Sequence, residues 1–580
     1  MGPLLKIEDL SLELRRDTNW NPILHHINLS LDEGETLGIV GESGSGKSVT
    51  ALSVMQLLNP KIARYPSGHI YFKNQEDDNA PLLDILKAPD SVMQTLRGNQ
   101  IGMIFQEPMT SLNPVIRCGQ QITEQILLHT KATEKEAKEQ VLSLFDEVRL
   151  PRPAQIFDSY PHELSGGQKQ RIMIAMAMSC HPKLLIADEP TTALDVTIQK
   201  NILELIRSLQ QKHGMSVLFI THDLGVMAEI ADRTIVMYKG QITEENSVRN
   251  IFLNPQHPYT KQLIACRPSM TQRLRKLPQV SDFEESKESE MQEVIEKLVI
   301  TPEERQHAHQ SLYANDKIIS IHNLNKVYKV RKRKLFEKQQ YFQALHNINL
   351  EIYEGETLGL VGESGCGKTT LGRSMLRLIE PSSGEVYYRG KNIVNLSASE
   401  MRKMRKDMQI ILQDPYSSLN QRLTIGEALM EPMRVHNILQ NDKERKRRVI
   451  ELLERVSLNE SHFYRYPHEF SGGQRQRISI ARALAVNPKF IICDESVSAL
   501  DVSVQAQVLN LLNELKEEFH FTYIFISHDF SVVKFMSDRI AVMQQGKIVE
   551  IGEADALCSN PQTDYAKKLI SAIPKGIVVS

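Results

Sequence analysis

The feature that most constrains the fold of this chain is a long internal repeat. The run LSGGQKQR, from Leu164 to Arg171, returns almost unchanged as FSGGQRQR, from Phe470 to Arg477. The serines of the two runs lie 306 positions apart, and later motifs keep the same offset. A period this long indicates a duplicated domain, because solenoid repeats span only about 20–50 residues. A chain of 580 residues is also too long for one hydrophobic core, so we expect two similar domains.

The offset between the halves also locates the domains. It is 321 between Lys47 and Lys368 but 307 between Gln106 and Gln413, so the first half carries a net insertion of 14 residues. We place this insertion in the polar, proline-containing stretch 74–89 and expect a surface loop there. The sequence predicts a first domain over residues 1–268, an acidic linker over 269–316 and a second domain over 317–580.

A solvated segment is the default expectation for the linker, because its second part is strongly acidic. Five apolar residues near its end nevertheless follow helical spacing: Met291, Val294, Ile295, Leu298 and Val299. They leave open a short helix that docks on one of the domains.

Each half alternates apolar runs with helical patterns. The runs ETLGIV, KLLIAD and SVLFITHD in the first half match ETLGLV, KFIICD and TYIFISHD in the second. Such continuous apolar runs are typical of strands that are buried on both faces of a parallel sheet. We therefore predict an α/β fold in each half.

Composition excludes several classes of protein. The 69 basic and 71 acidic residues nearly cancel, so no global nucleic-acid footprint is present. No apolar run approaches the roughly 20 residues that cross a bilayer, and the first residues lack a signal-peptide pattern. The six cysteines are scattered without a CxxC pair, which argues against a zinc site and a disulfide framework. We expect a cytoplasmic protein.

Two glycine-rich runs predict nucleotide binding. GESGSGKS, from Gly41 to Ser48, and GESGCGKT, from Gly362 to Thr369, each follow an apolar strand and open a helical pattern. This is the context in which a phosphate-binding loop (P-loop) places backbone N–H groups around phosphates at a helix N-terminus. The lysines are expected to reach the β- and γ-phosphates, and Ser48 and Thr369 to hold Mg²⁺. The predicted phosphate-binding residues are Gly41, Ser43, Gly44, Ser45, Gly46, Lys47, Ser48 and Val49 in the first half, and Gly362, Ser364, Gly365, Cys366, Gly367, Lys368, Thr369 and Thr370 in the second.

An Asp-Glu pair ends a later strand in each half. We expect Asp188 and Asp494 to bind the magnesium through water, and Glu189 and Glu495 to orient or deprotonate the attacking water. Strands often end in acidic residues, so these pairs indicate a catalytic site only because a P-loop precedes each of them.

These residues resemble those of the ATP-binding-cassette (ABC) ATPases, and the resemblance covers both halves almost end to end. It implies two tandem P-loop ATPase domains, each with a mainly parallel sheet and a helical subdomain. It also implies that Gln106 and Gln413 are Q-loop glutamines, which contact the metal and the γ-phosphate and couple to a membrane partner. His222 and His528 would be the switch histidines.

The resemblance further implies that the two halves share their nucleotide sites. The signature run of one domain would cover the nucleotide held by the other, so that Lys47 works with Ser471, and Lys368 with Ser165. The signature residues are Ser165, Gly166, Gly167 and Gln168 in the first half, and Ser471, Gly472, Gly473 and Gln474 in the second. The D-loops TALD and SALD end at Asp195 and Asp501. Tyr328 would stack on adenine in the second half, where the first half has Leu14.

The runs around the two glutamines, the YPHELSGGQ-type runs and the HPYTKQLI tail resemble the ATPases of peptide and nickel importers. The whole chain is similar to fused importer ATPases of the microcin C, oligopeptide and glutathione type. This implies ATP and Mg²⁺ as ligands, two membrane-spanning permeases near the Q-loops and, indirectly, a periplasmic or extracellular solute-binding protein. It places the chain peripherally on the cytoplasmic face of the bacterial inner membrane.

Two further expectations concern what such a chain lacks. Some relatives bind an iron–sulphur centre through a cysteine cluster in the tail, but Cys266 and Cys558 stand alone here, so we expect no cluster. The alternative function is that of a soluble twin-cassette ATPase acting on ribosomes. The TALD and SALD D-loops and the acidic linker fit this alternative poorly. The default interpretation of the basic run 329–334 is a solvated loop. We therefore expect no nucleic-acid partner.

Cys366 lies inside the second P-loop, where the first half has Ser45. A thiol near a helix N-terminus, in a field that favours anions, is expected to have a lowered pKa and to react with alkylating reagents. The alternative is that Cys366 is an unreactive small residue that takes the place of serine.

Overall fold

The computed structural model describes residues 2–16, 18–75, 81–106, 111–192, 194–279, 296–330, 339–498 and 500–574. The chain divides into two compact units. The first comprises 1–194, 198–264 and 574–580, and the second 195–197 and 265–573. The described part of the predicted linker therefore belongs with the second unit.

A six-stranded sheet forms the centre of the first unit, in the order β10-β9-β3-β8-β7-β6. Its strands are β3 (Thr36–Val40), β6 (Ile101–Ile104), β7 (Leu184–Asp188), β8 (Ser216–Thr221), β9 (Arg233–Tyr238) and β10 (Gln241–Ser247). All neighbours are parallel except β10, which runs antiparallel to β9. Every residue of β3, β7 and β8 is buried, which explains why these strands read as continuous apolar runs.

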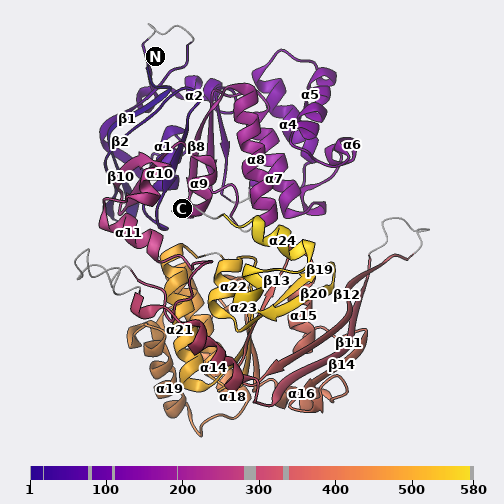
Figure 1. The fold of residues 1–580 in the computed structure, drawn as a ribbon. Coiled ribbons are helices and arrows are strands. Elements are labelled where there is room, and N and C mark those ends of the chain that lie inside the picture. Colours follow the sequence, from indigo (N-terminus) through magenta and orange to yellow (C-terminus); the bar gives the residue numbers. More distant parts are fainter. Residues whose placement is uncertain are drawn as a thin grey trace. The chain divides into compact units, whose positions relative to one another are not determined.

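A second, antiparallel sheet and a group of helices complete the first unit (Figure 1). The antiparallel strands are β1 (Leu5–Arg16), β2 (Asn19–Leu31), β4 (Ala63–Phe72) and β5 (Leu83–Asp84). The helices of the subdomain are α4 (Cys118–His129), α5 (Glu134–Glu147), α6 (Pro153–Phe157) and α7 (Gly166–Met178). One apolar core joins the antiparallel strands to the inner face of the parallel sheet.

The predicted insertion loop over 74–89 is partly wrong. Residues 76–80 lie outside the described residues, but Leu83–Asp84 forms β5, which pairs with β4. Ile85, the next residue, is fully buried in the core. Polar composition suggested a surface loop, but the apolar residues at its end anchor it to the sheet.

The second unit repeats this architecture. Its mainly parallel sheet has the order β16-β17-β18-β13-β19-β20, and its antiparallel sheet the order β12-β11-β14-β15. The strands are β11 (Lys317–Lys329), β12 (Tyr341–Tyr353), β13 (Thr357–Val361), β14 (Ser383–Tyr388), β15 (Lys391–Asn392), β16 (Met408–Ile411), β17 (Phe490–Asp494), β18 (Thr522–Ile526), β19 (Arg539–Gln544) and β20 (Lys547–Glu553). The α/β class and parallel sheets predicted from the sequence are confirmed in both units.

The helices of the second unit also follow those of the first. They are α15 (Lys368–Met375), α16 (Ala398–Met404), α17 (Pro415–Ser418), α18 (Ile425–Val435), α19 (Asp442–Arg455), α20 (Gly472–Leu484), α21 (Val502–Phe519), α22 (Phe530–Met536), α23 (Ala554–Ser559) and α24 (Asp564–Ser571). The remaining helices of the first unit are α1 (Lys47–Val54), α2 (Asp90–Leu96), α8 (Val196–His213), α9 (Leu224–Ile230), α10 (Val248–Leu253) and α11 (Pro258–Ala265).

The described part of the linker is folded. Residues 296–298 are helical, and α14 (Pro302–Leu312) begins with a capping box in which Thr301 and Glu304 exchange hydrogen bonds. Leu298 and Val299 pack against the core of the second unit, so these two residues of the predicted docking helix do dock. Met291, Val294 and Ile295 lie outside the described residues. The default expectation of a solvated segment is wrong for 269–279, where Leu274 and Leu277 are buried, whereas none of the residues of α14 is buried.

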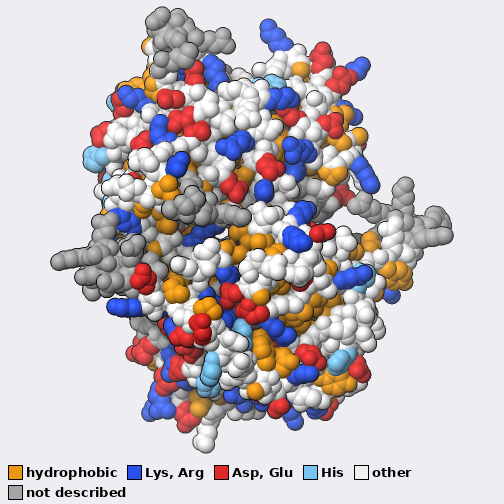
Figure 2. Space-filling model, viewed as in Figure 1, with side chains coloured by type: hydrophobic (Ala, Val, Ile, Leu, Met, Phe, Trp, Pro, Cys, Tyr) orange, Lys and Arg blue, Asp and Glu red, His pale blue; other side chains and the backbone are white. Residues whose placement is uncertain are grey.

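None of the described helices is long and apolar enough to cross a membrane. Figure 2 shows one face of the molecule, on which basic and acidic side chains are interspersed rather than gathered into patches of one sign. This pattern agrees with the formal net charge of −2.

Candidate functional site

The two P-loops have the same conformation. In each, the loop follows a buried strand (β3 or β13) and ends at the N-terminus of a helix (α1 or α15). The residues that cap these helices, Gly46 and Gly367, have φ of 104° and 110°. A Cβ at Gly46 would lie 2.5 Å from Leu24 Cδ2, so glycine is required both for the left-handed backbone and for the close packing.

Each P-loop lysine folds back over its own loop. Lys47 Nζ donates to the carbonyl oxygens of Gly41 and Glu42, both at 2.8 Å. Lys368 Nζ donates to Gly362 O at 2.6 Å and to Glu363 O at 3.1 Å. Both side chains are almost completely buried, so these carbonyls hold the ammonium groups within the loop that is expected to bind phosphate.

A hydroxyl and a carboxylate meet beside each lysine. Ser48 Oγ donates to Asp188 Oδ1 at 3.0 Å, and Thr369 Oγ1 donates to Asp494 Oδ1 at 3.0 Å. Burial raises the pKa of Asp188 to about 6, although the hydrogen bond from Ser48 lowers it; burial likewise raises the pKa of Asp494. Buried oxygen ligands whose negative charge is poorly compensated suit a hard divalent cation such as Mg²⁺.

The catalytic carboxylate predicted for the first unit lies at the centre of a polar cluster. Glu189 Oε2 accepts from Gln106 Nε2 at 3.2 Å and from Thr192 Oγ1 at 2.8 Å, and it lies 3.2 Å from His222 Nδ1. Glu189 also has a φ of 47°, in the left-handed region that non-glycine residues adopt mainly at constrained functional positions.

Glu189 and His222 shift each other's pKa. Burial alone would raise the pKa of Glu189, but the hydrogen bond and charge of His222, with the contributions of Thr192 and Lys47, lower it to about 2. Burial alone would lower the pKa of His222, yet the pairing with Glu189 raises it. Each of the two groups therefore favours the charged form of the other.

The second unit builds the same cluster more loosely. Glu495 Oε2 accepts from Gln413 Nε2 at 2.6 Å, but His528 Nδ1 lies 3.9 Å away. Ser498, at the position of Thr192, donates to the backbone oxygen of Glu495 at 3.0 Å instead of to its carboxylate. Glu495 has a φ of 49°, so the backbone geometry of the two units agrees while their side-chain contacts differ.

The signature serines begin helices. Ser165 caps α7 and Ser471 caps α20, each in a capping box with the glutamine three residues later. Both serines are exposed. The structure thus places these residues at solvent-exposed helix N-termini, where the helix dipole attracts anions. In the D-loops, Ala193 and Ala499 lie outside the described residues; Asp501 Oδ1 accepts from Val504 N at 2.9 Å and caps α21.

An aromatic ring other than Tyr328 lines the second P-loop. A cavity of about 450 Å³ is bounded by Ser364, Gly365 and Cys366 on one side and by Phe342 and His346 of β12 on the other. Tyr328 pairs with Phe342 across β11 and β12, and Lys326 Nζ lies 5.0 Å from the centre of its ring.

The expectation of a reactive Cys366 is wrong in its premise. Cys366 is buried, and burial raises the pKa of its thiol although Lys368 and backbone N–H groups lower it. The sequence correctly located the anion-favouring field, but it did not reveal that the thiol turns into the core under the loop.

Sequence reasoning missed one contact that both units share. The hydroxyl of Tyr259, on α11, accepts from the Glu42 amide at 3.2 Å, and that of Tyr565, on α24, accepts from the Glu363 amide at 3.1 Å. These tyrosines belong to the repeated tail and anchor the second residue of each P-loop. Their recurrence in both tails was the available signal.

The comparisons with known proteins agree with this geometry. The ABC transporter family model matches residues 24–192 and 345–498. The chain belongs to the ABC transporter ATP-binding proteins. The model of the oligopeptide/dipeptide transporter C-terminal region matches residues 243–292 and 549–576, which contain the two tail tyrosines.

Similar proteins span almost the whole chain. Glutathione import ATP-binding protein GsiA of Pectobacterium atrosepticum is 46% identical over 571 residues, which cover 98% of this chain and 89% of the relative. The protein of the same name from Escherichia coli O157:H7 is 46% identical over 578 residues, covering 99% and 90%. A solved dimeric structure of the ATP-binding cassette MJ0796, bound to ADP and Pi, matches 41% of this chain and 98% of its own with 32% identity and a TM-score of 0.37.

This chain is therefore the ATP-binding subunit of an ABC transporter of the oligopeptide and dipeptide class, and its ATP hydrolysis powers transport. The predicted family, fold and importer function are confirmed. The alternative function on ribosomes is not supported. Among the described residues, no group of three or more His, Cys, Asp or Glu side chains is arranged to hold a metal ion.

Proposed function

We propose that the chain binds two Mg-ATP molecules and uses their hydrolysis to import peptides or glutathione-like peptides. The observation that carries this proposal is the repeated cluster of P-loop lysine, hydroxyl–carboxylate pair and glutamate–glutamine pair, which both units build from the same positions. The names of the relatives and the matched C-terminal regions support a peptide-type solute.

Each side chain of the cluster has a distinct role in the proposed hydrolysis. Lys47 and Lys368 neutralise the β- and γ-phosphates, while the P-loop amides and helix dipole bind the remaining charge. Ser48 with Asp188, and Thr369 with Asp494, would hold Mg²⁺, which would neutralise negative charge on the phosphates.

The carboxylates of Glu189 and Glu495 orient the attacking water and accept its proton. Gln106 and Gln413 donate to these carboxylates in the structure, and their amide oxygens would be ligands for the Mg²⁺ of bound Mg-ATP. His222 and His528 would donate to the γ-phosphate.

Each nucleotide is completed by the signature serine of the other cassette in this proposal. A P-loop surrounds the phosphates from one side only, so the γ-phosphate needs further donors. The exposed N-termini of α7 and α20 offer such donors, with Ser471 acting on nucleotide at Lys47 and Ser165 on nucleotide at Lys368. Asp195 and Asp501 belong to the same shared sites.

The proposed partners follow from the family. Two membrane-spanning permeases contact the chain near Gln106 and Gln413, and a solute-binding protein outside the membrane delivers the peptide to them. The chain lies peripherally on the cytoplasmic face of the membrane.

Reconstitution tests this proposal. The chain is purified with its permease partners, placed in proteoliposomes with the solute-binding protein, and supplied with labelled glutathione or a labelled tripeptide. We expect uptake and solute-stimulated ATP hydrolysis, both abolished in Lys47→Ala/Lys368→Ala. ATP hydrolysis without uptake of either solute would contradict the proposed substrate class, and no hydrolysis would contradict the assigned sites.

A further inference from the structure

The two described stretches of the linker form a short paired stem. Leu274 and Val299 make an antiparallel bridge. Arg275 N donates to Leu298 O at 2.8 Å, and Ile300 N donates to Arg273 O at 2.9 Å. The stem therefore fixes the start of α14. Its two stretches are separated in the sequence by residues 280–295.

Apolar contacts and a buried amide fix the stem to the second cassette. Leu277 is completely buried in the cassette core. Asn510, on α21, accepts from Leu277 N and donates to Leu277 O, both at 2.8 Å. A side chain that pairs with both polar groups of one buried residue fixes the register of that residue.

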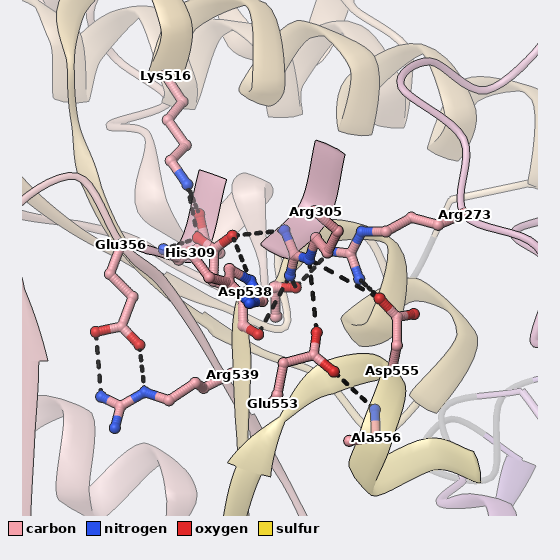
Figure 3. A network of polar contacts seen from close by, with 12 residues as sticks. Arg273, Arg305, His309, Glu356, Lys516, Asp538, Arg539, Glu553, Asp555 and Ala556 are labelled. Atoms are coloured by element: carbon pink, nitrogen blue, oxygen red, sulfur yellow. Dashed lines mark hydrogen bonds and ion pairs between the residues drawn. The ribbon is translucent and has the colours of Figure 1, made fainter. Parts of the chain in front are cut away.

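Two linker arginines bind the end of helix α22 (Figure 3). Arg305 Nη1 donates to Asp538 Oδ1 at 2.8 Å, and Arg305 Nη2 donates to Ser537 O at 2.9 Å. Arg273 donates to Ser537 O as well and pairs with Asp555 at 3.1 Å. Lys534, on α22 itself, donates to the backbone oxygen of Met270 at 2.5 Å.

These contacts reach the base of the P-loop strand. Asp538 Oδ2 accepts from Thr357 N, the first residue of β13, at 2.9 Å and pairs with Lys516 at 3.1 Å. Burial alone would raise the pKa of Asp538, but Lys516 and Arg305 hold it well below its ordinary value. One carboxylate thus joins α14 of the linker, α21 and the strand that leads into the P-loop.

The duplicated first cassette is an internal control for this surface. Asp232 corresponds to Asp538 and accepts from Thr36 N at 2.9 Å, so the link to the P-loop strand is common to both cassettes. Glu553 Oε1 also lies 3.5 Å from Arg305 Nε. The residues that contact the linker differ in the first cassette: Lys534, Glu553 and Asp555 correspond to Ala228, Ser247 and Arg249. Arg249 would repel a linker arginine, so the described residues of the first cassette do not reproduce this docking surface.

We propose that the linker is a docking element specific to the second cassette and that it holds the C-terminal end of α22. This helix begins directly after His528 and Asp529, and all seven of its residues are buried. A rigid helix transmits restraint at one end to the other, so the linker restrains the switch histidine of one site and not of the other. The docking is independent of the function proposed above, whereas its effect on hydrolysis rests on that function.

The test converts the docking surface into that of the first cassette. The full chain with Lys534→Ala/Glu553→Ser/Asp555→Arg is compared with wild type by hydrogen–deuterium exchange. Lys547→Gln is the matched control, because it also installs the first-cassette residue, on an exposed position of β20. We expect exchange over residues 301–312 and 530–537 to rise by at least about tenfold in the triple variant, with the control and the first cassette unchanged.

Two results would overturn the proposal. Unchanged exchange over 301–312 would show that this surface does not hold the linker. Faster exchange over 301–312 without any change over 530–537 would show that the linker docks but does not hold α22. If exchange in β13 and β17 also rises, the variant has unfolded the cassette; Arg273→Ala, which alters the linker alone, is then judged on the same two segments.

Discussion

The tail tyrosines give a prediction whose size follows from one hydrogen bond. Tyr565→Phe keeps the ring and its packing but removes the hydroxyl that accepts from the Glu363 amide at 3.1 Å. A neutral hydrogen bond of this kind contributes about 0.5–1.5 kcal/mol. Since a factor of ten in binding corresponds to about 1.4 kcal/mol, ATP should bind the second site about two- to tenfold more weakly.

The loss should appear in binding and not in the chemical step, because the hydroxyl touches the backbone of the loop and no reacting group. Isothermal titration with Mg-ATP gives the dissociation constant of the second site in a chain whose first site is disabled by Lys47→Ala. Tyr387→Phe serves as control: its hydroxyl donates to the exposed Glu385 at 3.0 Å on the antiparallel sheet. The reasoning is refuted if Tyr565→Phe binds ATP as tightly as wild type, or if the control weakens binding equally.

Three other predictions concern the first and second P-loop sites. Thr192→Val should slow single-turnover hydrolysis at the first site about tenfold, because it removes a hydrogen bond to a charged carboxylate, whereas Thr192→Ser should retain the rate; equal losses would exclude a role for the hydroxyl. Iodoacetamide should alkylate Cys366 more slowly than free cysteine at pH 7, and the rate should rise with pH, since burial raises the pKa of the thiol. Mass spectrometry measures the rate, and alkylation of Cys366 faster than that of free cysteine at pH 7 would contradict this prediction. The His222 ring should titrate above its ordinary value of 6.5 in NMR spectra. The lowered pKa of Glu189 stabilises the folded state above pH 4.5, and this contribution is lost as pH falls towards 2. The raised pKa of His222 stabilises the folded state below pH 6.5, and this contribution is lost at higher pH. Because Glu189 is what raises the pKa of His222, Glu189→Gln should lower the midpoint of the histidine titration.

Much of the architecture was predictable because the chain carries it twice. Strands such as TLGIV and TLGLV are buried on both faces, so they are recognisable in the sequence as continuous apolar runs. The P-loop residues and the Asp-Glu pairs have rigid backbone requirements, so their sequences are nearly fixed. Gln106 and Glu189 meet because parallel strands bring their ends to one edge of the sheet.

The features that the sequence did not reveal depend on single contacts between distant segments. The linker docks through Arg273 and Arg305, which look like ordinary solvated charges until Asp538 and Asp555 are placed beside them. The difference between Thr192 and Ser498 is one methyl group in the sequence, but in the structure one hydroxyl points to the carboxylate and the other to the backbone. Side-chain direction of this kind is set by packing and not by local pattern.

The most direct test of two functional ATP sites is the double variant Glu189→Gln/Glu495→Gln, measured for both nucleotide retention and hydrolysis. The amide keeps the shape of each site and its hydrogen bonding to Gln106 and Gln413, but it cannot accept a proton from water. We predict that the variant retains two Mg-ATP per chain while hydrolysis falls on the order of 10²-fold. Hydrolysis at the wild-type rate, or retention of a single nucleotide per chain, would contradict the account.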